Sequence, residues 1–299
     1  MLLSVDDIQK LLDEGGFRAH YRGPGGVSIT GFSDPGDYRP QTAIWLGASK
    51  YLHLGEGMEC ADVALLFAAS DFEGLDSFPA VFVCDDPRNA FMYVVESVVP
   101  ARRLSGVSEH AHVDPSARLG ERVYVGPGAF VDADVSIGDG TMVYPHASIK
   151  RGTVIGADCV IMDGCVIGNE GFGFRRCPDG ALKRLPHLGR VVIGDRVEVG
   201  SNSIIDKGTF RDTVVESGTK IDTLTVIGHN AHIGRDCFVI GGFVGGNSVI
   251  GDGCELIHMQ CKNRVSIGAG AKVGIGSVVI RDIPGGVEVF GNPARVIRK

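Results

Sequence analysis

An aliphatic side chain returns every six residues from position 113 onward. The first unbroken run is Val113, Leu119, Val125, Val131, Ile137, Val143, Ile149, Ile155, Ile161 and Ile167. Neither the 3.6-residue period of a helix nor the two-residue period of a flat strand produces this register. A short fixed period predicts a solenoid, in which short strands alternate with tight corners and the aliphatic side chains fill the interior.

The fifth position of each repeat holds a small residue. Examples are Ala117, Ala129, Thr141, Ala147 and Thr153. Four of the eight cysteines share this position, namely Cys159, Cys165, Cys237 and Cys254. There we expect small buried side chains rather than metal ligands or redox groups. The 44 glycines suit many tight corners. The sequence therefore predicts a mainly β protein, a left-handed parallel β-helix of hexapeptide repeats.

The period is interrupted in places that we expect to build the binding face. The largest break, 169–190, holds two phenylalanines and several basic residues. Shorter irregularities are the 17-residue steps that follow Ile233 and Ile250. A solenoid accepts an insertion only where a loop can leave the coil, and such loops often carry function.

The first 100 residues lack the period. Ser4 can cap a helix over about 5–14, and a second helix is expected from Asp85-Asp86-Pro87 to Val98, with proline in its first turn. Short apolar runs lie between them. The sequence thus predicts two domains, a small α/β domain at 1–100 and the solenoid at 101–299.

Charge and hydropathy exclude some classes of protein. The formal net charge of −7 argues against a nucleic-acid-binding protein, which needs clustered positive charge. No apolar run approaches the roughly 20 residues of a membrane span. The start, MLLSVDDIQK, carries acids where a signal peptide carries bases. We therefore expect a cytoplasmic protein without an integral membrane segment.

Several long segments resemble one family, the UDP-3-O-acylglucosamine N-acyltransferases of the lipid A pathway. They are ITGF at 29–32, the GFGF loop with RLPHLGRVVIGDRVEVGSNSIIDKGTF, and KIDTLTVIGHNAHIG. The resemblance implies a homotrimer with active sites between neighbouring solenoids. It also implies a nucleotide-sugar substrate and a thioester acyl donor, on acyl carrier protein or coenzyme A, with no tightly bound cofactor.

Amide formation from a thioester needs a base and donors for the developing oxyanion. His229 is our candidate base, because it takes an outward position of its hexapeptide, is of the residue type best suited to proton transfer near neutral pH and matches the family's catalytic histidine. By resemblance, Asp222 is the acid that orients it, and Gly246 is a candidate oxyanion donor. The predicted contacts to substrate or donor are Phe172, Phe174, Arg184, His187, Asn230, Arg264 and Arg295.

The resemblance also marks a nucleotide site and two departures. Trp45 and Tyr51 fall on the positions that stack on uracil in the family, and stacking on a base contributes about 1–3 kcal/mol. Ala48 replaces the family's base-contacting asparagine, which leaves uracil versus thymine open. Arg264 stands where the family has a second histidine, and a contact to phosphate or to the pantetheine arm is expected instead.

Two further interpretations stay open. The final segment GNPARVIRK is similar to the C-terminal segment of coenzyme A-dependent hexapeptide acetyltransferases. At this point the lipid A family continues into a helical extension. This favours, as an alternative, a short-chain acyl-coenzyme A enzyme that acts on nucleotide amino sugars for surface polysaccharide. More remote are a non-catalytic sugar-nucleotide scaffold and a solenoid carbonic anhydrase using His229, His232 and His258.

Overall fold

The chain folds into two compact units, residues 1–103 and residues 104–299. The structure is a computed structural model, and it describes residues 2–47, 59–100 and 103–298. Within this described part, no helix is both long and apolar enough to cross a membrane.

Two helices of the N-terminal unit begin where the sequence predicted. Helix α1 spans Val5–Glu14, and the Ser4 side chain accepts a hydrogen bond from Asp7 N while the Asp7 side chain bonds back to Ser4 N. Helix α2 spans Pro87–Val98, with Asp86 as its cap and proline in its first turn. These reciprocal bonds satisfy N–H groups that a helix start leaves without partners. Both helix predictions are confirmed.

A five-stranded sheet forms the centre of this unit. Its order is β2 (Ala19–Arg22), β7 (Val81–Cys84), β6 (Leu65–Ala68), β5 (Thr42–Leu46) and β4 (Gly31–Phe32), with β2 antiparallel to β7 and the other pairs parallel. Strands β1 (Leu3–Ser4) and β3 (Ser28–Ile29) form a separate, short antiparallel pair. Ile8, Leu12 and Phe91 of the helices pack with Phe67 and Phe82 on one face. A second apolar cluster covers the other face, as a largely parallel sheet requires.

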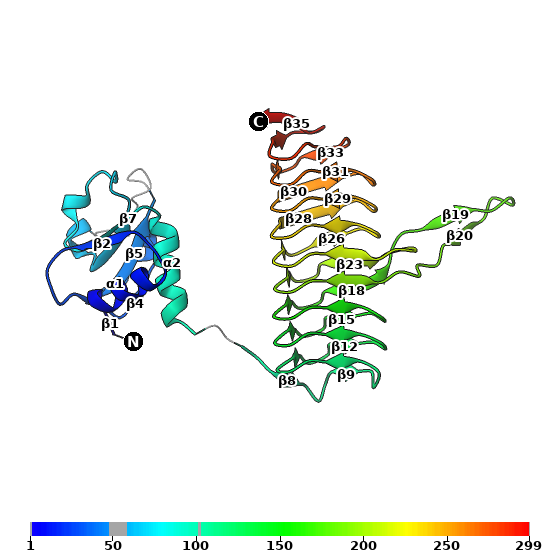
Figure 1. The fold of residues 1–299 in the computed structure, drawn as a ribbon, viewed down its shortest axis with the longest axis horizontal. Helices are drawn as coiled ribbons and strands as arrows, with labels where there is room; N and C mark the ends of the chain where they lie inside the picture. Colours follow the sequence, from blue (N-terminus) through cyan, green and yellow to red (C-terminus); the bar gives the residue numbers. More distant parts are fainter. Residues whose placement is uncertain (1, 48–58, 101–102, 299) are drawn as a thin grey trace. The chain divides into compact units, whose positions relative to one another are not determined.

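The second unit is a parallel β-helix whose coils stack from β8 to β35 (Figure 1). One face is a sheet of eight strands: β10 (Arg118–Leu119), β13 (Ser136–Ile137), β16 (Val154–Ile155), β21 (Val191–Ile193), β24 (Thr213–Val215), β27 (His232–Ile233), β29 (Val249–Ile250) and β31 (Ser266–Ile267).

The other faces are joined into a sheet of 18 strands. These are β8 (Gly106–Val107), β9 (His112–Val113), β11 (Tyr124–Val125), β12 (Phe130–Val131), β14 (Met142–Val143), β15 (Ser148–Ile149), β17 (Val160–Ile161), β18 (Val166–Glu170), β22 (Glu198–Val199), β23 (Ile204–Lys207), β25 (Lys220–Ile221), β26 (Thr225–Ile227), β28 (Phe238–Val244), β30 (Glu255–Cys261), β32 (Lys272–Val273), β33 (Val278–Val279), β34 (Glu288–Phe290) and β35 (Arg295–Arg298).

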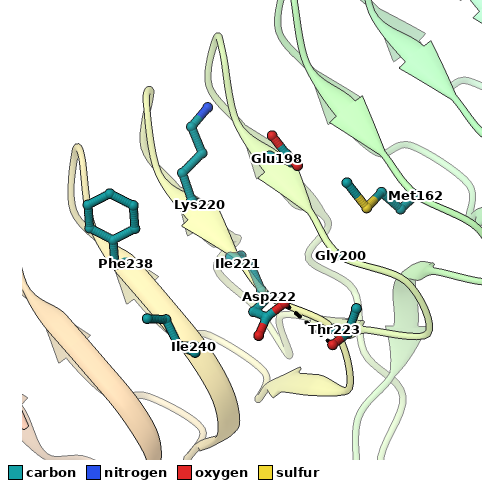
Figure 2. A pocket seen from close by; sticks show the side chains of 9 residues that line it. All are labelled: Met162, Glu198, Gly200, Lys220, Ile221, Asp222, Thr223, Phe238 and Ile240. Atoms are coloured by element: carbon teal, nitrogen blue, oxygen red, sulfur yellow. Dashed lines mark hydrogen bonds between the residues drawn. The ribbon is translucent and has the colours of Figure 1, made fainter. Parts of the chain in front are cut away.

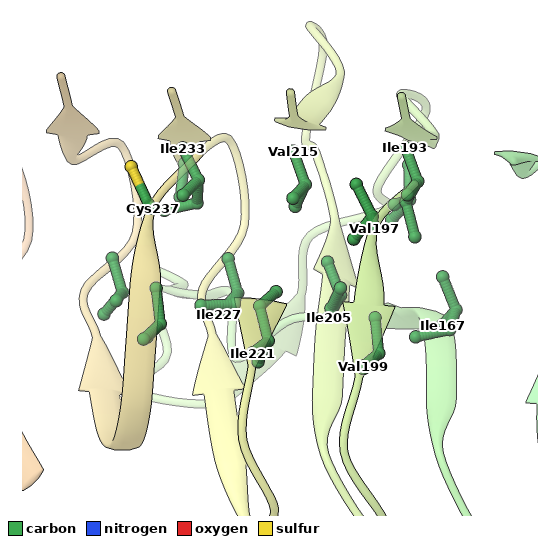
Figure 3. Close-up of a cluster of buried hydrophobic side chains, with 14 of the residues drawn as sticks. Ile167, Ile193, Val197, Val199, Ile205, Val215, Ile221, Ile227, Ile233 and Cys237 are labelled. Carbon is green, nitrogen blue, oxygen red and sulfur yellow. The ribbon is translucent and has the colours of Figure 1, made fainter. Parts of the chain in front are cut away.

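The six-residue period sets the register of the coils. Leu119 pairs with Ile137 and Ile137 with Ile155, so that one regular coil takes 18 residues, or three repeats. The aliphatic residues point inward and stack on one another along the axis (Figure 3). The four cysteines at the fifth position are buried and unpaired, as predicted. Cys165 Sγ, for example, donates to Gly200 O at 3.1 Å.

The predicted breaks are also found. Ile155 pairs with Ile193, and within this long coil the segment between β18 and β21 leaves the solenoid as an arm whose tip is the antiparallel hairpin β19 (Phe174–Arg176) and β20 (Leu182–Arg184). In Figure 1 this arm projects from the side of the solenoid. Ile233 pairs with Ile250 and Ile250 with Ile267, each 17 residues apart, which confirms the two short steps.

Candidate active site

His229 lies at a corner of the solenoid, just after β26. Its side chain is half-buried. It borders a cavity of about 780 Å³, and the other residues that line this cavity are Asn247, Lys262, Asn263 and Arg264. Those four come from the next two coils along the axis, since Asn247 N donates to His229 O and Arg264 N donates to Gly246 O. The period thus places the corners of three coils side by side.

Asn230 fixes the orientation of the His229 ring. Its Oδ1 accepts hydrogen bonds from His229 Nδ1 at 3.0 Å and from Thr209 N at 3.1 Å. Its Nδ2 donates to Arg211 O at 2.7 Å. Because an amide oxygen only accepts, the Nδ1 atom carries the proton in this network and Nε2 of the neutral ring is the free base. The ring is therefore prepared to take a proton from the cavity.

Asn230 is buried, and its side chain supports the His229 ring. The residue is only 3% exposed, and both ends of its amide are used inside the protein. Its φ of 60° is left-handed, a conformation that asparagine adopts more readily than most residues. Its predicted contact to substrate or acyl donor stays a prediction. What the hydrogen bonds show is that Asn230 holds the His229 ring.

Gly246 lies against the open edge of the His229 ring. A Cβ atom at this position would come within 2.8 Å of His229 Nε2. The N–H group of Gly246 donates to Asn263 Oδ1 at 2.9 Å. The predicted role of Gly246 as oxyanion donor therefore requires the Asn263 side chain to release this N–H group. Its lack of a side chain has a simpler consequence, because it keeps Nε2 accessible.

Replacing Gly246 with alanine should lower kcat by at least about tenfold, because a displaced base loses its near-attack geometry. The added methyl would meet the end of a side chain that can turn away, so the fold should survive. We would measure steady-state transfer and the thermal unfolding midpoint together. An unchanged kcat in a folded Gly246→Ala variant would show that Nε2 does not work from its observed position.

His187 packs beneath His229 at the base of the arm. It is 3% exposed, and its ring meets the His229 ring edge-on with 5.5 Å between centroids. Its Nδ1 lies 3.1 Å from Leu185 O, while Nε2 is buried and has no hydrogen-bond partner. A Cβ on Gly171 would lie 3.1 Å from this Nε2 and 3.1 Å from His229 Cβ. His187 thus supports the corner that carries His229 from inside.

The other predicted arm residues lie further out. The Phe172 side chain is 88% exposed and its ring lies 5.0 Å from that of Phe174. Arg184 stacks over the Phe174 ring at 4.7 Å and donates to Gly171 O at 3.3 Å. Exposed aromatic and guanidinium groups at the edge of a site suit a nucleotide sugar or an acyl donor. Their assignment as ligand contacts stays a prediction.

Asp222 faces a different pocket from His229. Figure 2 shows it beside Lys220, Phe238 and Ile240, in a mostly apolar pocket of about 360 Å³. Thr223 Oγ1 donates to Asp222 Oδ1 at 3.4 Å. The six residues between Asp222 and His229 include strand β26 on one face of the solenoid. A single chain therefore does not bring the predicted acid to the predicted base.

The remaining predicted residues are spread over both units. Arg264 shares the cavity of His229. Arg295 lies on the exposed strand β35, where its Nη1 donates to Ala294 O. Trp45 is half-buried and packs against the helix-side core of the N-terminal unit, so part of its surface is used for folding. Tyr51 and Ala48 lie outside the described residues.

Asp206 is a member of this site that the sequence interpretation missed. It follows Ile205, which pairs with Ile227, and so lies one coil below the His229 corner. Asn169 Nδ2 donates to Asp206 Oδ1 at 3.2 Å. Burial raises the pKa of Asp206, and this hydrogen bond and the positive charge that His229 and His187 can carry act in the opposite direction. Its place in the segment IIDKGTF, beside a break in the period, was the available signal.

No cluster of three or more histidine, cysteine or carboxylate side chains that could hold a metal ion occurs in the described ranges.

Comparison with known proteins identifies the class first. Residues 134–169 match the family described as bacterial transferase hexapeptide (six repeats). The UDP-N-acetylglucosamine acyltransferases of Campylobacter jejuni and Francisella novicida have the same fold, with TM-scores of 0.57 and 0.58 at 20% and 23% identity. The matches cover 64% and 65% of this chain and 73% and 70% of theirs. The solenoid is thus a left-handed β-helix of hexapeptide repeats, as predicted.

The sequence relatives are more specific. A UDP-3-O-acylglucosamine N-acyltransferase from Rhizobium meliloti (strain 1021) is 39% identical over 131 residues, which is 43% of this chain. The enzyme of the same name from Caulobacter sp. (strain K31) is 39% identical over 132 residues. The match spans only 37% and 38% of the length of these relatives. The chain is therefore a hexapeptide-repeat protein related to the UDP-3-O-acylglucosamine N-acyltransferases over part of its length.

Proposed function

We propose that this protein is an N-acyltransferase that moves an acyl group from a thioester to the amine of a nucleotide-linked amino sugar. The substrate class that we favour is a UDP-3-O-acylglucosamine, as named for its relatives. One observation carries the proposal. The Nδ1 atom of His229 is held by Asn230, and the His229 side chain lines a cavity that Lys262 and Arg264 also line.

The proposed reaction has a simple proton balance. The sugar amine attacks the thioester carbonyl, and His229 Nε2 accepts a proton from the attacking nitrogen. The tetrahedral intermediate collapses, the carbon–sulfur bond breaks, and the proton passes to the leaving thiolate. The products are an amide and a free thiol. Asn230 keeps the ring in the tautomer that this sequence needs.

The cations beside His229 fit the charges of the proposed ligands. Lys262 and Arg264 line the same cavity, and they would attract the phosphates of a nucleotide sugar or of coenzyme A. Arg264 thereby takes a binding role where the family has a histidine. Whether the acyl group arrives on acyl carrier protein or on coenzyme A is a question for the assay.

We also propose that the active unit is a homotrimer. A solenoid presents flat faces that suit packing against copies of itself. Asp222 and His229 lie in different pockets of one chain, and a neighbouring copy would be able to bring an acid from one corner to the base of another. The cytoplasmic location expected from the sequence stays a prediction.

The direct test is transfer with defined donors and acceptors. We would incubate the protein with UDP- and dTDP-linked amino sugars, each with acyl chains on carrier protein and with acetyl-coenzyme A, and measure product masses. We expect amide formation with a UDP amino sugar that carries a 3-O-acyl group. Transfer only from acetyl-coenzyme A would reject the lipid A substrate and support the polysaccharide alternative. No transfer from any pair would leave the scaffold interpretation.

A further inference from the structure

Asp206 occupies a defined place under the catalytic corner. Strand β23 pairs with β18 on one side, where Asp206 stands opposite Asn169, and with β26 on the other, where Ile205 stands opposite Ile227. Adjacent strands lie about 4.8 Å apart. The carboxylate therefore belongs to the coil next to His229, and it is partly buried there.

The Asp206 carboxylate has one described side-chain donor, and the neighbouring His187 ring has an unsatisfied nitrogen. Asn169 Nδ2 donates to the carboxylate at 3.2 Å. His187 Nδ1 lies beside Leu185 O, so its Nε2 is a buried acceptor without a donor in the described structure. An unsatisfied buried polar atom costs about 1–3 kcal/mol. A proton that enters this region is therefore stabilised by the Asp206 carboxylate and by His187 Nε2.

The other charged groups around the ring are cationic. Lys262 and Arg264 border the cavity, and Arg211 Nη2 donates to Asn230 O at 3.3 Å. These groups oppose a positive charge on His229. A carboxylate is needed to offset them when the ring takes a proton.

Two further acids on neighbouring segments already have partners. Glu170 lies 3.2 Å from Lys207 Nζ. Asp212 lies 3.2 Å from Arg190 Nε, and it also accepts from Arg190 N. Their charges are balanced by these cations.

We propose that Asp206 is a positioning residue whose carboxylate is the counter-ion of protonated His229, in the role that the sequence suggested for Asp222. The buried His187 ring contacts the His229 ring edge-on. This deepens the proposed function and rests on it, because a counter-ion matters only if His229 takes a proton. During transfer the amine proton moves to Nε2, and the charge formed on the ring is paired with Asp206 below it.

The test measures the pKa of His229 without any substrate. Diethylpyrocarbonate reacts with the unprotonated imidazole, so the rate of modification at His229, followed by peptide mass spectrometry against pH, gives its midpoint. In Asp206→Asn the imidazolium loses a nearby negative charge, and the midpoint should fall by about one pH unit. Asp206→Glu retains the charge and should restore most of the shift.

His232 provides the matched control in the same spectra. Its Nε2 lies 3.3 Å from Glu216, on another face of the solenoid. Asp206→Asn should leave the His232 midpoint unchanged. Glu216→Gln should lower the His232 midpoint and leave that of His229 in place. An unmoved His232 midpoint also shows that a variant is folded around β27.

Three results would overturn the proposal. The first is an unchanged His229 midpoint in Asp206→Asn. The second is a larger shift in Asp222→Asn than in Asp206→Asn, which would return the role to Asp222. The third is an equal shift in Asp206→Asn and Asp206→Glu, because the effect would then come from a changed side-chain shape and not from the lost charge. A failure of the proposed function would be seen separately. The wild-type protein would then show no acyl transfer, whatever the measured midpoints of His229 and His232.

Discussion

Replacing His229 with alanine should lower kcat for amide formation by at least about 100-fold, the loss expected for a general base. The imidazole is held through Nδ1 by Asn230, which leaves Nε2 without a hydrogen bond to Asn230, and the side chain lines the cavity. Alanine removes the proton acceptor and leaves the backbone bonds of the corner in place, such as Asn247 N to His229 O. The measurement is steady-state transfer with the donor and acceptor pair found in the product assay.

The control for this variant is His232→Ala. His232 lies three residues further along and has an exposed side chain paired only with Glu216 in the described structure. Its loss should change kcat by less than about twofold, since an exposed ion pair contributes about 0–1 kcal/mol to stability and none of the chemistry. Near-normal turnover in His229→Ala, or equal losses in the two variants, would contradict the mechanism.

Replacing Ile233 with alanine should lower the free energy of unfolding by about 2–5 kcal/mol, the usual cost of emptying a buried aliphatic position. Ile233 is fully buried and stacks between Val215 and Ile250 in neighbouring coils. The side chain of alanine leaves a cavity that these two rigid coils are unable to close. Chemical denaturation followed by circular dichroism would measure the change.

The adjacent residue again supplies the comparison. His232 and Ile233 form one short strand, β27, with His232 outward and Ile233 inward. His232→Ala should cost no more than about 1 kcal/mol. If the two variants lose similar stability, the six-residue period would not mark the interior of the solenoid as we describe it.

The fold was largely predictable because each repeat obeys the same local rule. Positions 233 and 137 must both be aliphatic because both side chains fill the interior of the solenoid. Every repeat therefore carries the same information about the register. The helix caps at Ser4 and Asp86 were equally local, since each cap bonds to a residue three positions away. Such interactions are visible in sequence because they act over a few residues.

The site was only partly predictable, because its members come from different coils. His229 was chosen as the candidate base from its outward place in a repeat and from the family resemblance. Asn230 was predicted as a contact to substrate or acyl donor, and its hydrogen bonds with Thr209 and Arg211 were not foreseen, since those residues belong to a loop of the preceding coil. Asp206 was missed for the same reason. Adjacency along the axis depends on the length of every insertion between the coils.

The sequence by itself determined the solenoid and the inward and outward positions of its repeats, and it supplied His229 as the candidate base. The tertiary structure decided what surrounds that histidine. It brought Asn230, His187 and Asp206 to the ring and directed Asp222 to another pocket. The physical reason is that a periodic strand fixes which way a side chain points, whereas the stacking of coils fixes which distant side chain it meets.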